Sequence, residues 1–157
     1  MSMDTETTAR TVRPVSASGL ARLRRGSLAV LVLIVADYVI GMYVNLYVTV
    51  PRADRGSSLG RAISAGPAIL SIHAVIGLLL GLGALSVLVQ AVMARHWGIT
   101  ALTAVGLFAL AFAAVAGASF TSTGDAAVSM AMAVMTGVAL LCYALNLYLL
   151  GPGRQRG

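Results

Sequence analysis

The stretch from Ala68 to Met93, AILSIHAVIGLLLGLGALSVLVQAVM, carries no formal charge and limits the fold more than any other part of the chain. It is longer than the roughly 20 apolar residues that a helix needs to cross the hydrocarbon core of a bilayer. Three further stretches, at about 27–50, 98–120 and 126–150, are also long and apolar enough. We therefore predict an all-α integral membrane protein in which residues 26–150 form an up-down-up-down bundle of four transmembrane helices, the second at about 68–93.

The composition favours a membrane protein over a soluble or nucleic-acid-binding one. Of the 157 residues, 59% are hydrophobic and only 10% are charged, which excludes an ordinary soluble domain. The 11 basic residues are all arginines, and most of them lie beside the apolar stretches. A nucleic-acid-binding protein would instead gather basic residues on one folded face with aromatic side chains that stack on bases.

The positions of the arginines also predict an orientation. Eight of them fall in residues 1–25, in the second loop or in residues 151–157. The positive-inside rule then places both termini in the cytoplasm and the protein in the cytoplasmic (inner) cell membrane. We expect residues 1–25 to be a disordered basic tail and residues 151–157 to be a short basic tail. Anionic lipids are the expected partners of three juxtamembrane arginines, Arg22, Arg24 and Arg25.

Small residues recur at every fourth position of the predicted helices, on faces that often carry a polar side chain. Inside a membrane, small side chains let two helix backbones approach closely, so we expect these faces to form the contacts between helices. The faces are Asp37, Gly41 and Asn45; His73, Gly77 and Gly81; Ala109, Ala113 and Gly117; and Ser129, Ala133 and Gly137.

Asp37 lies about 14 Å from the inner end of its predicted helix, at the helical rise of about 1.5 Å per residue. Ionisable groups are costly in hydrocarbon, and the predicted spans contain no arginine or lysine to pair with this one. One interpretation is a neutral, hydrogen-bonded carboxyl group that joins the first helix to its neighbours. The other is a proton-relay or cation-pathway carboxylate in a small oligomeric transporter or proton conductor.

Four polar residues from four different helices are predicted at similar depth toward the outer side. They are His73, Asn45, Ser119 and Ser129. The layer is either a set of hydrogen bonds between helices or a small site that opens outward, in which His73 serves as an axial ligand, a proton carrier or a hydrogen-bond partner. In the structural interpretation, Asn45 and His73 bond directly or through one water molecule.

A haem b site on His73 is the alternative cofactor prediction. Two histidine ligands must lie at matching depths, whereas His96 lies a full span away from His73. The second ligand would be Met130, Met132 or the His73 of a second chain. The methionine-rich run SMAMAVM is more typical of flexible core filling. We predict no metal site and assign no catalytic residue, because the chain has no phosphate-binding loop, HExxH, CxxC or serine-triad pattern.

Features at the helix ends complete the sequence-based picture. Five aromatic residues lie toward helix ends, as in an interfacial belt: Tyr43, Tyr47, Trp97, Tyr143 and Tyr148. Gly98 marks a tight turn between the second and third helices, and Thr123 or Asp125 is expected to cap the fourth.

Several short motifs resemble a group of small four-helix bacterial integral membrane proteins with no assigned activity. They are GMYVNLYVTVP at 41–51, HAVIGLLL at 73–80, GASF at 117–120 and SMAMA at 129–133. The resemblance covers about residues 28–150 and implies four helices without a mechanism. The predicted function is therefore an accessory or assembly component, either as a homo-oligomer or in a larger membrane complex. The alternatives are a haem-binding or redox protein that uses His73 and a small transporter that uses Asp37.

Overall fold

The protein folds into four long α-helices. The structure is a computed structural model that describes residues 17–47 and 67–151. Its helices are α1 (Ala17–Tyr47), α3 (Ala68–Met93), α4 (Trp97–Thr123) and α5 (Ala126–Leu149). All four are long and apolar enough to cross a membrane, so the prediction of an all-α bundle with four candidate transmembrane helices is confirmed. The predictions for residues 1–16, the first loop and residues 152–157 lie outside the described residues.

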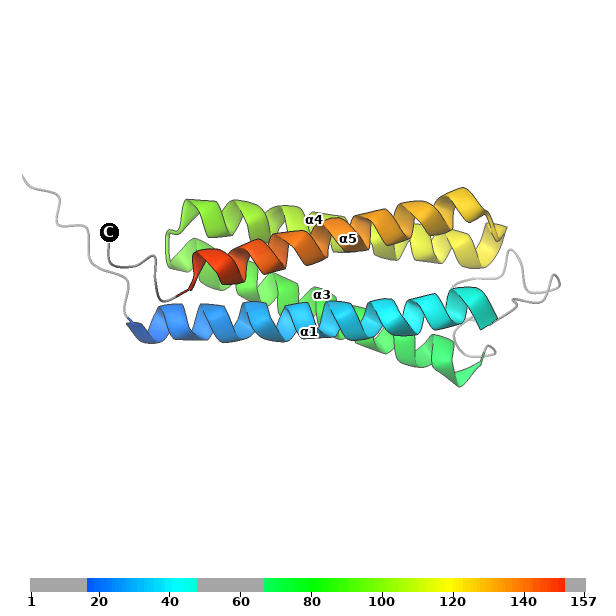
Figure 1. The fold of residues 1–157 in the computed structure, drawn as a ribbon, viewed down its shortest axis with the longest axis horizontal. Helices are drawn as coiled ribbons and strands as arrows, with labels where there is room; N and C mark the ends of the chain where they lie inside the picture. Colours follow the sequence, from blue (N-terminus) through cyan, green and yellow to red (C-terminus); the bar gives the residue numbers. More distant parts are fainter. Residues whose placement is uncertain (1–16, 48–66, 152–157) are drawn as a thin grey trace, which may run out of the picture.

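Successive helices run in opposite directions and pack as a ring (Figure 1). α1 packs against α3 and α5, and α4 packs against the same two helices. We call the end where α1 begins and α5 finishes the proximal end, because Ala17 and Leu149 both lie there. The opposite end, where α1 finishes and α5 begins, is the distal end.

α1 begins at Ala17 instead of near residue 27, so the prediction of disorder is wrong for residues 17–25. The physical reason is Leu23, which is 1% exposed and extends the buried face of α1 by one turn. Arg22, Arg24 and Arg25 project from the exposed faces of the same turns. The basic cluster therefore lies on a helix that continues into the span.

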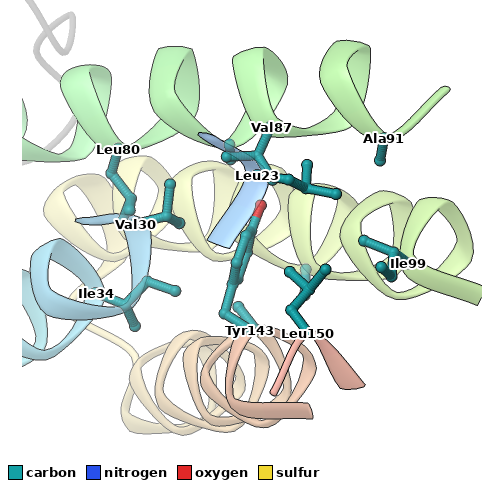
Figure 2. Close-up of a cluster of buried hydrophobic side chains, with 12 residues drawn as sticks. Leu23, Val30, Ile34, Leu80, Val87, Ala91, Ile99, Tyr143 and Leu150 are labelled. Atoms are coloured by element: carbon teal, nitrogen blue, oxygen red, sulfur yellow. The ribbon is translucent and has the colours of Figure 1, made fainter. Parts of the chain in front are cut away.

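The buried positions recur at intervals of three and four residues, the spacing of helices that pack nearly parallel in a bundle. On α1 and α3 most of them lie toward the proximal end, and α5 contributes Tyr143 and Leu150 at the same end. Figure 2 shows these side chains meeting between the helices. The members of this apolar core are Leu23, Val30 and Ile34; Leu80, Ala84, Val87 and Ala91; Ile99 and Ala109; and Ala139, Tyr143 and Leu150.

The two short connections use left-handed residues. Between α3 and α4 the residue with positive φ is Arg95, at 56°, so the turn lies just before Gly98, which is the second residue of α4. Gly124 ends α4 with a φ of 66°. The prediction of a cap by Asp125 is confirmed: its side chain accepts a hydrogen bond from the Ala127 N–H at 2.9 Å.

Candidate functional site

The two ionisable residues predicted inside the spans meet in the structure. His73 Nδ1 on α3 lies 2.8 Å from Asp37 Oδ1 on α1. The two side chains are 26% and 15% exposed, so the contact lies at the edge of the bundle and not in its centre. The predicted spans contain no arginine or lysine, so the sequence did not indicate a basic partner for Asp37. The partner is the histidine that had been assigned to a different depth.

Two glycines allow this contact. A Cβ placed on Gly41 of α1 would lie 3.0 Å from His73 Cε1, and one placed on Gly77 of α3 would lie 3.8 Å from Asp37 Oδ2. The imidazole thus lies over a glycine of α1, and the carboxyl group lies over a glycine of α3. Asp37 and His73 each lie four residues before a glycine of their own helix. Because the two helices are antiparallel, each of these side chains faces the glycine of the other helix.

The pair can remain uncharged overall while it holds one proton. A protonated imidazole beside a carboxylate and a neutral imidazole beside a carboxylic acid both have zero net charge. Zero net charge avoids the large cost of placing a lone ion in a low-dielectric medium. His73 and Asp37 therefore remove each other's desolvation problem, and the proton position between them is the one chemical variable of this site.

A second polar pair joins α1 to α5 nearer the distal end. The Ser129 hydroxyl group donates to Asn45 Oδ1 at 3.1 Å. The predicted outer layer therefore separates into two contacts, because His73 pairs with Asp37 and Asn45 pairs with Ser129. Ser119 enters neither contact: its carbonyl oxygen accepts hydrogen bonds from Ser122 and Thr123 within α4, and its side chain is exposed.

A third polar pair joins α4 to α5 and was missed by the sequence analysis. Asn146 Nδ2 donates to Thr103 Oγ1 at 2.9 Å, and both residues are 0% exposed. Neither residue was among the polar side chains singled out from the sequence. The sequence signal that could have found the pair is the position of Asn146 one turn after buried Cys142, on the core-facing side of α5.

The expected helix-packing residues divide into two groups. Ala109 and Ala113 are buried, and Gly117 packs on Met132, since a Cβ at Gly117 would lie 3.2 Å from the sulfur. Ala133 is half-buried. Gly81 and Gly137 have no described side chain or neighbouring-helix atom within 4 Å of an added Cβ. The described part of the chain therefore gives these two glycines no close helix contact.

Tyr143 is not a member of an aromatic belt. It is 0% exposed, and its ring lies against α4, where a Cβ on Gly106 would lie 2.9 Å from the Tyr143 Cε2 atom. Gly106 is therefore the glycine of α4 that most requires the absence of a side chain. The two aromatic residues at the distal end of α1 do remain exposed: the rings of Tyr43 and Tyr47 lie 5.0 Å apart.

The residues suggested as haem ligands are not gathered around His73. The Met132 sulfur is directed at Gly117 of α4, and Met130 is 66% exposed. Among residues 17–47 and 67–151, no group of three or more His, Cys, Asp and Glu side chains could hold a metal ion. The described chain therefore offers His73 as a single candidate ligand, which does not complete a haem site within one chain.

An apolar layer of α1 separates Asp37, toward the distal end, from the polar groups at the proximal end. On α1, Ile34 and Val30 follow Asp37 toward the proximal end and are 0% and 2% exposed. The next polar residue on this face is Ser27, about 15 Å from Asp37 by helical rise. The three polar pairs thus join three different pairs of helices and do not converge on one cavity.

Comparison with known proteins adds no identity to this geometry: no family model, curated protein or solved structure matches the chain. The composition of its helices makes it a multi-pass membrane protein. The resemblance to small four-helix bacterial membrane proteins stays a prediction.

Proposed function

We propose that this protein is a non-enzymatic accessory or assembly component of a cytoplasmic membrane. The observation that supports the proposal is that three pairs of intramembrane polar side chains each join two different helices. Asp37–His73 joins α1 to α3, Asn45–Ser129 joins α1 to α5, and Asn146–Thr103 joins α5 to α4. Catalytic and transport sites instead bring several polar groups to one cavity or path. Paired polar groups that connect neighbouring helices act as interhelical ties.

The proposed orientation has both termini in the cytoplasm. α1 starts and α5 finishes at the same end of the bundle, and the exposed Arg22, Arg24 and Arg25 lie at that end. These guanidinium groups would then meet anionic headgroups of the inner leaflet, each contributing about 1 kcal/mol. Reporter fusions after Gly151 test the orientation: an enzyme that works only in the periplasm should be inactive there, and activity would contradict a cytoplasmic C-terminus.

Native electrophoresis of gently solubilised membranes tests the accessory role. The full chain should migrate with another membrane protein, above the mass measured for the purified chain in the same detergent. The double variant Asp37→Leu/His73→Leu should still join this complex if the pair is only a tie between helices. Migration identical to that of the purified chain would contradict the proposal.

A second candidate function is proton handling at the Asp37–His73 pair. The observation that favours it is that two ionisable side chains of a membrane-spanning segment lie 2.8 Å apart and are partly exposed, as in membrane proton relays. The apolar layer at Val30 and Ile34 argues against a continuous path through one chain. In liposomes containing a pH-sensitive dye, proton conduction would require flux in the full chain and loss of that flux in Asp37→Leu, with Met93→Ala as the control. No flux in the full chain would contradict this function.

A further inference from the structure

Among the described residues, five buried polar atoms in the proximal half of the bundle lack a hydrogen-bond partner, and two of them, Gln90 Oε1 and His96 Nε2, belong to half-buried residues near its end. The other three belong to fully buried residues. They are the Ser27 hydroxyl oxygen on α1, and the Tyr143 hydroxyl oxygen and Asn146 Oδ1 on α5. All three residues are 0% exposed. Leaving such atoms unpaired in an apolar interior is costly, and buried polar atoms in folded proteins usually have a partner, either protein or ordered water.

The Asn146 carbonyl oxygen is fixed in this position by its neighbour. The Thr103 hydroxyl group donates its only proton to the Ile99 carbonyl oxygen at 2.7 Å, so Thr103 Oγ1 can only accept from Asn146. Asn146 must therefore present its NH₂ group to Thr103, at 2.9 Å. The amide assignment follows from this network, and it leaves Oδ1 as an acceptor that needs a different donor.

Ser27 differs from the other hydroxyl groups inside the helices. Thr103 and Thr136 each donate to the carbonyl oxygen four residues earlier, at 2.7 and 2.9 Å, which is the usual solution for a hydroxyl in an apolar helix. The Ser27 hydroxyl has no such bond. It is therefore available to a partner outside its own helix.

Ser27 and Asn146 lie at one level of the bundle, and Tyr143 lies one turn of α5 before Asn146. The Asn45–Ser129 bond gives a common reference point on α1 and α5. Toward the proximal end, Ser27 lies about 27 Å from it along α1 and Asn146 lies about 26 Å from it along α5, at about 1.5 Å per residue. Figure 2 shows the Tyr143 hydroxyl pointing away from α5, toward the side chains of Leu23 and Val87. A Cβ on Gly26, the neighbour of Ser27, would lie 3.0 Å from Val87 Cγ2.

We propose that a buried water molecule binds between Ser27, Tyr143 and Asn146 and joins α1 to α5. Water can donate two hydrogen bonds and accept two, and buried waters typically have two to four polar partners. Here it donates to Asn146 Oδ1, which can only accept, and accepts from the Tyr143 hydroxyl group. Ser27 supplies a third partner of either kind.

The variant Tyr143→Phe tests the proposal, because the direction of the change in the unfolding midpoint distinguishes a bound water from an unpaired hydroxyl group. If a water is bound, removing the hydroxyl takes away one of its partners, and the unfolding midpoint in detergent should fall by about 2–4 °C, the shift typical of about 1 kcal/mol in a chain of this size. If no water is bound, the same change removes an unpaired buried hydroxyl, and the midpoint should stay constant or rise. Tyr38→Phe, on an exposed face of α1, is the matched control.

A second variant and a direct measurement keep the proposal testable. Ser27→Ala should also lower the midpoint, and Ser27→Ala/Tyr143→Phe should lower it by less than the sum of the two single shifts, because both remove partners of one water. NMR of the full chain in micelles should show magnetisation transfer from water to the Tyr143 hydroxyl or to the Asn146 side chain. A constant or raised midpoint for Tyr143→Phe, or no transfer from water to either group, would overturn the proposal.

Discussion

The contact between Asp37 and His73 makes a quantitative prediction for a double-mutant cycle. The variants are Asp37→Leu, His73→Leu and the double variant. Each single change leaves the other polar group without its partner at 2.8 Å, whereas the double variant removes both polar groups together. An unpaired polar group left in a low-dielectric site costs about 1–3 kcal/mol, but replacement of both partners is close to neutral.

Geometry and exposure decide the size of the expected coupling. Hydrogen bonds between membrane helices average about 0.6 kcal/mol and reach about 1.7 kcal/mol, whereas bonds to a charged group are worth about 1.5–3 kcal/mol. Asp37 and His73 are close enough for the stronger class, but the two facing atoms do not have the angles of a hydrogen bond and the side chains are 15% and 26% exposed. Both features weaken the contact. We therefore expect a coupling energy of about 1–2 kcal/mol.

Reversible unfolding in mixed micelles, followed by circular dichroism while a denaturing detergent is added, would measure the four free energies. Asp37→Leu combined with Met93→Ala is the control, because Met93 is 78% exposed and lies about 30 Å along α3 from His73. The control pair should be additive within about 0.5 kcal/mol. Equal additivity in the Asp37/His73 cycle would refute the argument that the two side chains stabilise each other.

Three further substitutions test the local geometry by the same unfolding measurement. Gly41→Ala should destabilise the protein by about 1–2 kcal/mol, because its Cβ would press on the His73 ring at 3.0 Å; Gly81→Ala, which meets no described neighbour within 4 Å, is the control and should have no such cost. Gly106→Ala should cost about 1–3 kcal/mol, since its Cβ would lie 2.9 Å from the buried Tyr143 ring; an unchanged free energy would show that the ring can move aside freely. Arg95→Gly should stabilise the protein by about 0.5–1 kcal/mol, because Arg95 has a φ of 56° that glycine adopts without strain; a loss of stability would mean that the arginine side chain contributes more than the backbone strain costs.

The fold was largely predictable because it follows from uncharged stretches of sufficient length. α3 has the predicted limits, Ala68–Met93, since charged or helix-ending residues flank it on both sides. The start of α1 was not predictable from hydropathy, because residues 17–25 are polar in composition and become helical through one side chain, Leu23, that reaches the core. Local composition does not reveal such a tertiary contact.

The polar contacts were only partly predictable. The spacing of four residues showed that Asp37 shares a helix face with Gly41 and that His73 shares one with Gly77. The depth of each ionisable residue in the membrane was measured from a different end of its helix. The sequence therefore did not show that the two faces meet. Their pairing depends on the axial register of α1 against α3. The glycines permit the observed register, but the residue pattern of a single helix does not determine it. The same limit applies to Gly81, where a small residue at the right spacing meets open space.

The distance between Asp37 and the next polar group on its face of α1 bears on whether the Asp37–His73 pair is a tie between helices or part of a proton path. A proton that enters at Asp37 must cross about 15 Å of α1 before the next polar group on the same face, Ser27, and Ile34 and Val30 close that interval at 0% and 2% exposure. Proton transfer along hydrogen bonds needs donors and acceptors within about 3 Å of one another, so the interval would have to be bridged by several water molecules in a layer made of aliphatic side chains. Such waters would lack the polar partners that hold buried water in place. The packing of α1 is therefore consistent with a tie between helices and argues against a proton path along this face of α1.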